Sequence, residues 1–233
     1  MEAEDFKNGQ ILLIDKPLNW TSFQVVNKLR WAIRKKFGLK KIKVGHAGTL
    51  DPLATGLLII CTGRFTKKIS EFQSQSKEYT GTIHLGATTP SHDLETEVDR
   101  TWPLDHITEE LIYAAADHFT GIIEQSPPIY SAVKQDGERL YLKARRGEQV
   151  EIKTREVEIH SFVITRIQMP EVDFKVLCSK GTYIRSLAHD FGRHLNSGAH
   201  LIALCRTKSG DFDLEEAETI ETFLERLRAD QNR

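Results

Sequence analysis

The chain is poor in cysteine and in long apolar runs. Its 233 residues include three cysteines, Cys61, Cys178 and Cys205, which lie far apart and form no C-x-x-C pair. This pattern argues against a disulfide framework or a cysteine-based zinc site, and it fits a reducing compartment. No apolar run reaches the length of a membrane span, and the acidic start MEAEDFKNGQ does not resemble a signal peptide. We therefore expect a cytoplasmic protein with no membrane association.

Cofactor and metal signatures are missing as well. The sequence contains neither the G-x-G-x-x-G nor the G-x-x-x-x-G-K-[ST] pattern, so it does not indicate a nucleotide cofactor. His46 has no second histidine at helical spacing, and its only acidic neighbour in sequence is Asp51, which matches no metal-binding pattern. We expect no cofactor and no metal.

Charge is nearly balanced overall but unevenly distributed. The net charge is −1, yet the segment between Asp15 and Asp51 contains no acidic residue and nine basic ones. A second basic cluster consists of Lys134, Arg139, Lys143, Arg145 and Arg146. Either cluster alone is typical of a solvated helix face. Because acidic residues are concentrated elsewhere, the two clusters together predict a surface that binds the phosphates of RNA.

Apolar periodicity predicts an α+β fold with a mixed, mostly antiparallel central sheet flanked by helices. Strands are expected at 9–17, 57–63, 77–86, 155–167, 172–181 and 200–207, and helices at 21–38, 66–72, 108–121, 183–195 and 213–230. The strands outnumber the helices that could connect them in parallel, which favours antiparallel pairing. We see no linker or repeat, so a single domain over residues 1–233 is the simplest prediction, with an inserted arm at about 125–150.

Several helix ends carry capping residues. Thr21 and Gln24 form a capping-box pattern, and Gly38 follows the expected helix as a terminator. Thr108 and Thr182 are expected to cap the helices that follow them. In the helix expected at 21–38, the apolar stripe predicted to face the core begins at Phe23.

Asp51 is the unusual residue of the stretch VGHAGTLDPLATGLLIICTG. It lies between Leu50 and Pro52 in a glycine-rich segment, where no regular element continues easily. Its carboxylate could cap a turn, form an ion pair or act in catalysis, and turn capping is the commonest of these roles. An ionised carboxylate could also attack or stabilise the anomeric carbon of a ribose, or remove a neighbouring proton.

A buried aspartate needs a nearby cation to remain ionised, and arginine is the natural partner. Arg185, in the segment KGTYIR at an expected strand-to-helix turn, is our candidate. It could equally be a solvated helix residue, although the apolar residues around it favour burial.

The segment GHAGTLDPLATGLL closely resembles the signature of the TruB family of tRNA pseudouridine synthases. Further blocks agree in order: KP followed by TSF, KEYTGTIHLG, SPPIYSAVKQDGERLYLKARRG, CSKGTYIRSLAHDFG and GAHLIALCRTKSGDF. The resemblance extends from about residue 11 to about residue 217. It implies the pseudouridine synthase fold and isomerisation of uridine-55 in the TΨC loop of tRNA, by base flipping, glycosidic cleavage and re-formation of the bond to carbon.

The resemblance also implies roles for individual residues. Asp51 becomes the catalytic aspartate, with Arg185 as its ion-pair partner. Tyr79 stacks on the flipped uracil and is a further catalytic candidate, and His46 contacts the RNA near that base. Tyr183 and Leu204 line the base pocket. The basic cluster in the arm, which includes Lys134, Arg139, Lys143, Arg145 and Arg146, becomes the RNA-gripping surface.

One departure concerns Asn19, which stands where glycine is common after the KP pair. Because asparagine tolerates left-handed backbone, we expect no loss of function there. The chain ends about twenty residues after SGDF, so we expect no C-terminal RNA-binding PUA domain. We also expect a monomer whose partner is the TΨC stem-loop of tRNA, with no obligate protein partner.

Two other activities remain compatible with the sequence. An RNA N-glycosidase would use the same carboxylate but release the base. A non-catalytic tRNA-binding module would not need Asp51 at all, and an acidic residue in the centre of such a surface would repel phosphate.

Overall fold

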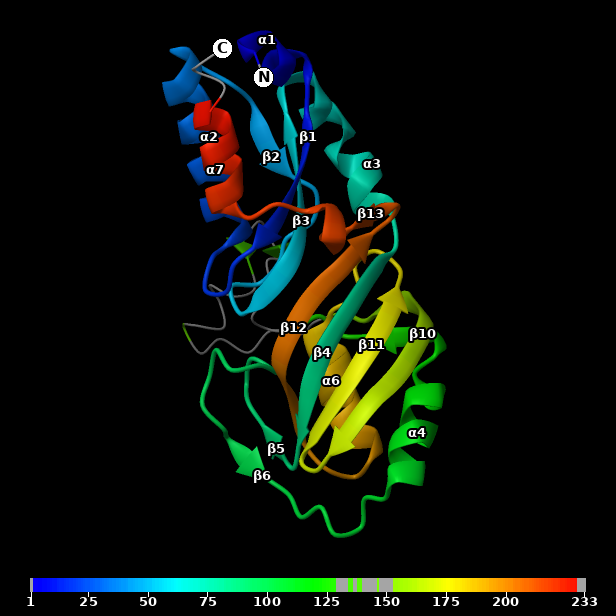
Figure 1. The fold of residues 1–233 in the computed structure, drawn as a ribbon. Helices are drawn as coiled ribbons and strands as arrows, with labels where there is room; N and C mark the ends of the chain where they lie inside the picture. The colour runs from blue at the N-terminus through cyan, green and yellow to red at the C-terminus, as the bar shows by residue number, and fades with distance from the viewer. Residues whose placement is uncertain (1, 129–133, 136–137, 140–145, 147–152, 230–233) are drawn as a thin grey trace. The chain divides into compact units, whose positions relative to one another are not determined.

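The computed structural model describes residues 2–128, 134–135, 138–139, 146 and 153–229 (Figure 1). The chain divides into two compact units. The first unit combines residues 1–79 with residues 204–233, and the second consists of residues 80–203. Strands β4 (Lys77–Leu85) and β12 (Ala199–Ser209) each contribute residues to both units. The single domain predicted from the sequence stays a prediction.

The first unit is built around strand β3 (Ala54–Thr62). Its helices and the remaining strands are α1 (Ala3–Asn8), β1 (Ile11–Lys16), α2 (Ser22–Phe37), β2 (Val44–His46), the 3₁₀ helix η1 (Gly63–Lys68), α3 (Ile69–Ser74), β13 (Phe212–Asp213), the 3₁₀ helix η2 (Leu214–Glu216) and α7 (Ile220–Ala229). Strands β1 and β2 pair with β3 in antiparallel fashion, whereas β12 pairs with it in parallel. The sheet is therefore mixed, as predicted.

Strand β3 is buried along almost its whole length, which explains its nearly continuous apolar sequence. In helix α2, the buried residues include Val25, Val26, Leu29 and Ile33. Helices α2 and α7 lie side by side in Figure 1 and contact each other.

The described part of the second unit contains a layer of long antiparallel strands and two helices. Its elements are β5 (Ala87–Thr88), β6 (Arg100–Thr101), α4 (Glu109–His118), β7 (Gly121–Gln125), β8 (Lys134–Gln135), β9 (Glu138–Arg139), β10 (Arg155–Gln168), β11 (Glu171–Cys178) and α6 (Ile184–His194). The strand order is β4, β11, β10, β7, and β10 is antiparallel to both of its neighbours. The rings of Phe162 and Phe174 meet edge to face in its core, with centroids 5.7 Å apart.

Several predicted helix ends are confirmed. The hydroxyl of Thr21 accepts a hydrogen bond from the Gln24 backbone N–H, the Gln24 side chain completes the capping box, and Gly38 ends α2 in the left-handed conformation. Asn19 adopts a φ of 64°, as its tolerance for left-handed backbone allows. Thr108 caps α4 through the backbone N–H of Leu111.

Other expectations are wrong in detail. Thr182 does not cap α6, because its hydroxyl donates to the Ser179 carbonyl and Tyr183 takes the cap position. Phe23 does not face the core, since 62% of it is exposed. The closing helix is split into η2 and α7, because the capping box of Asp213 with Glu216 closes only a single turn.

Candidate active site

Asp51 lies on the loop between β2 and β3, in the first unit. The side chain is half-buried, and the backbone around it is fixed at two points. The Ala54 N–H donates to the Asp51 carbonyl at 3.1 Å, and the Asn19 N–H donates to the Pro52 carbonyl at 2.8 Å. The loop therefore holds the carboxylate at a defined position although it belongs to no helix or strand.

The N-terminus of α2 clamps the residue before Asp51. The buried hydroxyl of Ser22 accepts a hydrogen bond from the Leu50 N–H at 2.9 Å and donates one to the Leu50 carbonyl at 3.1 Å. Both backbone groups of Leu50 are thus satisfied by one side chain. This contact gives Ser22, in the TSF block of the sequence, a clear role in positioning Asp51.

Lys16 is a buried cation beneath this loop. None of its surface is exposed, and its Nζ donates to the carbonyl of Trp20 at 2.6 Å, of Pro17 at 3.0 Å and of Pro52 at 3.4 Å. Desolvation lowers the pKa of Lys16 to about 8, while the negative charge of Asp51 acts in the opposite direction. Lys16 remains charged at neutral pH and contributes a positive potential at Asp51.

Arg206, on β12, is a second buried cation in the same unit. Only 1% of it is exposed, and its guanidinium donates from Nε to the Leu57 carbonyl at 2.7 Å and from Nη2 to the Gly48 carbonyl at 3.3 Å. Gly48 precedes Asp51 and Leu57 follows it, so Arg206 ties together the two sides of the loop. Its charge also helps to lower the pKa of Lys16.

Gly56 makes this arrangement possible. It is the β-sheet partner of Arg206 and has a φ of 96°, in the region that favours glycine. A Cβ atom at this position would lie 2.4 Å from the Arg206 carbonyl oxygen. Glycine is therefore required for β12 to approach the strand that follows Asp51.

Three other predicted site residues belong to the first unit. Leu204 is the strand partner of Ala54, three residues after Asp51, and its carbonyl accepts a hydrogen bond from the Thr55 hydroxyl at 3.4 Å. His46 is half-buried on β2, and burial lowers the pKa of its imidazole, so the ring is neutral at pH 7. Tyr79 lies on β4 with 8% of its surface exposed.

Arg185 and Tyr183 belong to the second unit. Arg185 lies in the first turn of α6 and is 3% exposed. Its Nη1 donates to the Ser91 carbonyl at 3.0 Å and lies 3.5 Å from a carboxylate oxygen of Asp93. Arg185 is thus buried rather than solvated, and its predicted ion pair with Asp51 stays a prediction.

Tyr183 is held at the start of α6 by Gln125. Its backbone N–H donates to the Gln125 side-chain oxygen at 2.7 Å, and its carbonyl accepts from the Gln125 amide at 3.1 Å. The guanidinium of Arg155 lies over the tyrosine ring, 4.8 Å from its centroid. The backbone and the ring of Tyr183 are both fixed by these contacts.

Much of the predicted RNA-gripping arm lies outside the described residues, including Lys143, Arg145 and the expected basic helix. Lys134 on β8 and Arg139 on β9 are partners in an antiparallel pair. Arg146 is exposed.

Within the described part of the chain, no group of three or more His, Cys, Asp or Glu side chains is placed to hold a metal ion. No helix there is both long and apolar enough to span a membrane.

The sequence interpretation missed Lys16, Arg206 and Asp93 as site residues. A signal for Lys16 was present, because burial alternates along β1 and places it in phase with Leu12 and Ile14. The sequence contained no comparable signal for Arg206, since its burial results from the parallel pairing of β12 with β3. Asp93 lies in a segment whose polar composition indicated only a loop.

Comparisons with known proteins identify the family. The model of the TruB family pseudouridylate synthase N-terminal domain matches residues 34–184, and that of the tRNA pseudouridylate synthase B C-terminal domain matches residues 185–232. A protein of Flavobacterium johnsoniae named tRNA pseudouridine synthase B is 62% identical over 98% of this chain and 100% of its own length. One of the same name from Phocaeicola vulgatus is 57% identical over 96% of this chain and 95% of its own length.

Solved structures give the same fold. A chain of a Cbf5-Nop10-Gar1 complex superposes with a TM-score of 0.72 at 30% identity, over 97% of this chain and 56% of that one. A chain of an H/ACA RNP bound to a substrate RNA containing 2′-deoxyuridine gives a TM-score of 0.68 at 27% identity, over 94% and 53% of the two chains. The fold is that of the pseudouridine synthases, as predicted. With an aspartate on a loop braced by two buried cations and close relatives aligned over nearly its whole length, the chain belongs to the TruB family of pseudouridylate synthases and is an isomerase.

Proposed function

We propose that this chain converts uridine-55 in the TΨC stem-loop of tRNA into pseudouridine. The observation that carries the proposal is Asp51, held on its loop by Ser22 and Arg206 with the ammonium of Lys16 beneath it. The curated relatives named tRNA pseudouridine synthase B support tRNA as the substrate. Action on tRNA fits the cytoplasmic location expected from the sequence.

The chemistry begins with uridine rotated out of its stack, because the reacting atoms are not accessible inside the loop. The carboxylate of Asp51 then either adds to carbon 1′ of the ribose or takes a proton from carbon 2′. Either route breaks the bond between carbon 1′ and nitrogen 1 of the base. The uracil turns in its pocket and carbon 1′ bonds to carbon 5. As this bond forms, the bond between Asp51 and carbon 1′ breaks in the first route, and the proton returns to carbon 2′ in the second. The proton of carbon 5 is then lost, and nitrogen 1 carries a proton in the product.

The charge environment of Asp51 suits both routes. Each requires an ionised carboxylate, and the positive charges of Lys16 and Arg206 favour that form. In this proposal Arg185 is the ion-pair partner of Asp51 and adds a third cation at the carboxylate. Its buried pairing with Asp93 holds the guanidinium in one orientation.

The remaining site residues hold the substrate. Tyr79 stacks on the flipped uracil, and Tyr183 and Leu204 form the walls of the base pocket. His46, neutral at pH 7, contacts the RNA next to the target base without adding charge. The arm residues Lys134, Arg139, Lys143, Arg145 and Arg146 contact the phosphates of the stem-loop.

Replacing Asp51 by asparagine tests the mechanism. Asp51→Asn keeps the shape of the side chain but removes its charge, so we expect pseudouridine formation in a tRNA transcript to be abolished while tRNA binding is retained. The product is detected site by site, and its mass separates two activities: isomerisation leaves the RNA mass unchanged, whereas an N-glycosidase lowers it by one base. Normal turnover by Asp51→Asn would refute the mechanism.

Arg185→Lys tests the proposed third cation. Lysine keeps the positive charge but loses the planar, forked geometry of the guanidinium. We expect the single-turnover rate to fall more than the affinity for tRNA. A variant that binds more weakly yet reacts at the parental rate would contradict the role of Arg185 at the carboxylate.

A further inference from the structure

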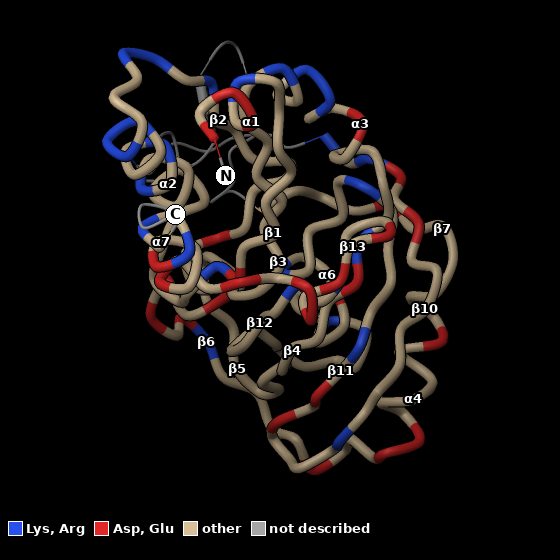
Figure 2. Tube along the Cα trace, turned by 45° about the horizontal axis from the view of Figure 1, so that its top comes forward, with Lys and Arg blue, Asp and Glu red and all other residues tan. Residues whose placement is uncertain are grey.

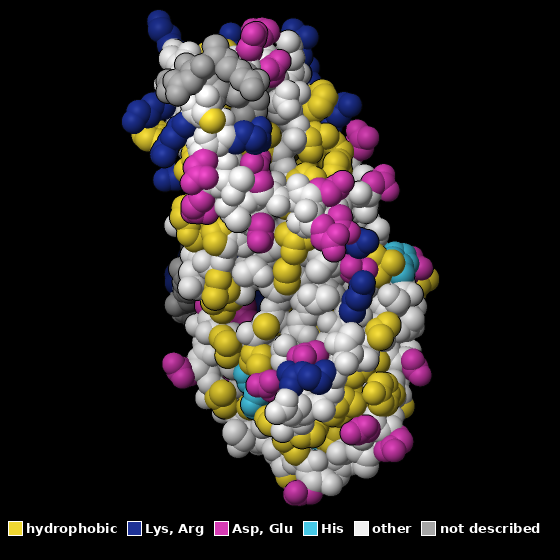
Figure 3. Space-filling model, in the orientation of Figure 1, with side chains coloured by type: hydrophobic (Ala, Val, Ile, Leu, Met, Phe, Trp, Pro, Cys, Tyr) yellow, Lys and Arg dark blue, Asp and Glu magenta, His cyan; other side chains and the backbone are white. Residues whose placement is uncertain are grey.

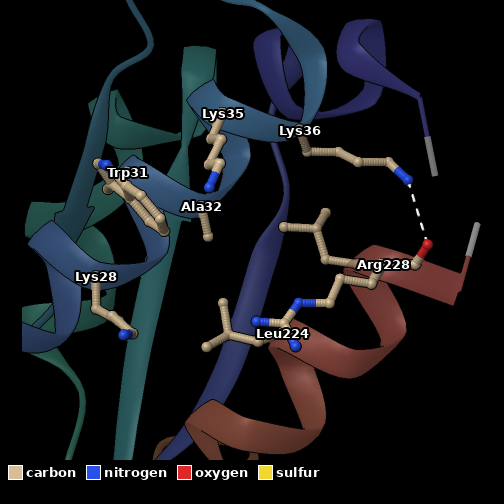
Figure 4. Close-up of a pocket in the computed structure, with 8 residues that line it drawn as sticks. Lys28, Trp31, Ala32, Lys35, Lys36, Leu224 and Arg228 are labelled. Carbon is tan, nitrogen blue, oxygen red and sulfur yellow. Dashed lines mark hydrogen bonds between the residues drawn. The ribbon is translucent and has the colours of Figure 1, made fainter. Parts of the chain in front are cut away.

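A basic pocket lies between α2 and α7, apart from the residues assigned to catalysis. It has a volume of about 250 Å³ and is formed by Lys28, Trp31 and Lys35 of α2 together with Leu224, Leu227 and Arg228 of α7 (Figure 4). The α2 residues follow the i, i+3, i+7 spacing of one helix face. The two helices therefore present one continuous surface.

Trp31 is the unusual residue of this pocket. It is 57% exposed, although burying its large ring would stabilise the fold. The Nζ of Lys35 lies over the ring, 4.9 Å from the centroid. In Figure 4 the indole faces the pocket from α2, with Leu224 and Arg228 on the opposite side. A flat apolar ring is thus available to a ligand beside a row of cations.

The charge of the pocket selects the chemistry of that ligand. Among the described residues, four basic ones line it, since Lys36 joins the three already named, and no acidic one does. Lys36 donates to the Arg228 carbonyl at 3.5 Å and so connects the two helices. Figure 2 marks further Lys and Arg positions along α2 and the segment after it, and Figure 3 shows Lys and Arg side chains gathered on the same part of the first unit. The ligand must combine a planar apolar group with negative charge, which describes a nucleotide.

The position of α2 relates the pocket to RNA. The helix begins at Ser22, which binds the residue before Asp51, and Trp31 lies nine residues further, about 14 Å along the axis. A nucleic acid whose target base reaches Asp51 therefore has a second contact point on the same helix.

We propose that this pocket binds an unpaired nucleotide of the RNA substrate, with the base stacked on Trp31 and its phosphates neutralised by Lys28, Lys35 and Arg228. The inference rests on the proposed function only in taking RNA as the partner. Base stacking on aromatic side chains and phosphate contacts from flexible cations together form the usual site for single-stranded nucleic acid. The site adds affinity, while chemistry remains at Asp51.

The test measures binding of a full-length tRNA transcript to the complete chain. We expect Trp31→Ala to raise Kd by about tenfold, the size typical of one lost stacking contact, while Trp31→Phe restores most of the affinity. Tyr113→Ala, which removes a half-exposed aromatic side chain from α4, is the matched control and should leave Kd unchanged. At saturating tRNA the rate of Trp31→Ala should equal that of the parent, with only KM raised.

The charge part of the inference has its own measurement. Replacing Lys28 and Lys35 by glutamine should reduce the slope of log K against log salt by about 1.5, since two phosphate contacts are lost. An unchanged slope, or an unchanged Kd in Trp31→Ala, would overturn the inference. A Kd raised equally by Trp31→Ala and Trp31→Phe would also overturn it, because phenylalanine still stacks. If the parent bound tRNA and showed the Trp31 effect without forming pseudouridine, only the proposed function would fail.

Discussion

Lys16→Met is the most informative single change in the first unit. Methionine keeps the length of the side chain and its apolar stem but removes the ammonium. The carbonyls of Trp20, Pro17 and Pro52 then lose a buried donor, and Asp51 loses a neighbouring positive charge. We expect lower stability, and slower turnover because the loop that carries Asp51 is less well held.

The contacts set the size of the effect. Hydrogen bonds from a charged group contribute about 1.5–3 kcal/mol each, and two of the three are 3.0 Å or shorter. The desolvation that lowers the pKa of Lys16 offsets part of this gain. We therefore expect the free energy of unfolding to fall by about 3 kcal/mol. With a urea m value of about 3 kcal/mol/M, the midpoint falls by about 1 M.

The assay is urea unfolding followed by tryptophan fluorescence in a Trp102→Phe background. The two remaining tryptophans, Trp20 and Trp31, both lie in the first unit, so the signal reports that unit alone. Lys40→Met, at an exposed lysine of the same unit, is the control and should change stability by less than about 0.5 kcal/mol. Equal midpoints for Lys16→Met and Lys40→Met would refute the bracing role of Lys16.

Comparison of the parent with Lys16→Met also tests the pKa of Lys16. In the folded state this pKa is about 8, below the ordinary 10.5, so between those values the unfolded chain binds more protons than the folded one. Stability from this group therefore rises with pH over that window. The stability difference between the parent and Lys16→Met should widen from pH 7.5 to pH 10, and a constant difference would contradict the lowered pKa.

Two further changes probe the backbone around the site. Gly56→Ala should destabilise the first unit by about 3 kcal/mol or more, since it combines a positive φ with a Cβ contact of 2.4 Å. Gly38 also has a positive φ, but no atom would lie near its Cβ, so Gly38→Ala should lower stability by only about 1 kcal/mol. Similar midpoints for these two variants in the urea assay would contradict the close approach of β12 to β3. Thr21→Ala should lower stability by about 1 kcal/mol through the lost cap of α2, and an unchanged melting temperature would contradict the capping box.

Local features of the fold were predictable because they depend on neighbouring residues. The capping box of Thr21 and Gln24, the glycine at the end of α2 and the left-handed Asn19 all follow from chemistry within a few positions. The strand predicted at 77–86 is likewise observed as β4, and Tyr79, Ile83 and Leu85 are among its buried residues. Such patterns are reliable where one side chain and the adjacent backbone decide the outcome.

The bracing of Asp51 was not predictable in the same way. Arg206 is 155 positions away in sequence, and only the parallel pairing of β12 with β3 brings it to Gly48 and Leu57. Lys16 is in phase with the buried residues Leu12 and Ile14 of β1, but it also belongs to a basic segment, and basic composition favours a surface position. Charge patterns predicted contact with RNA, but they could not separate the cations that support the loop from those that face solvent.

The first unit is built from two segments that are far apart in sequence, residues 1–79 and 204–233. This arrangement constrains when the protein becomes active during synthesis. The Asp51 loop is synthesised in the first third of translation. Residues 80–203 are then completed before the ribosome produces Arg206 or α7. Pairings between such distant segments form late and slowly. A chain that ends before Arg206 is therefore expected to lack both the Arg206 contacts to the Asp51 loop and the α7 side of the basic pocket.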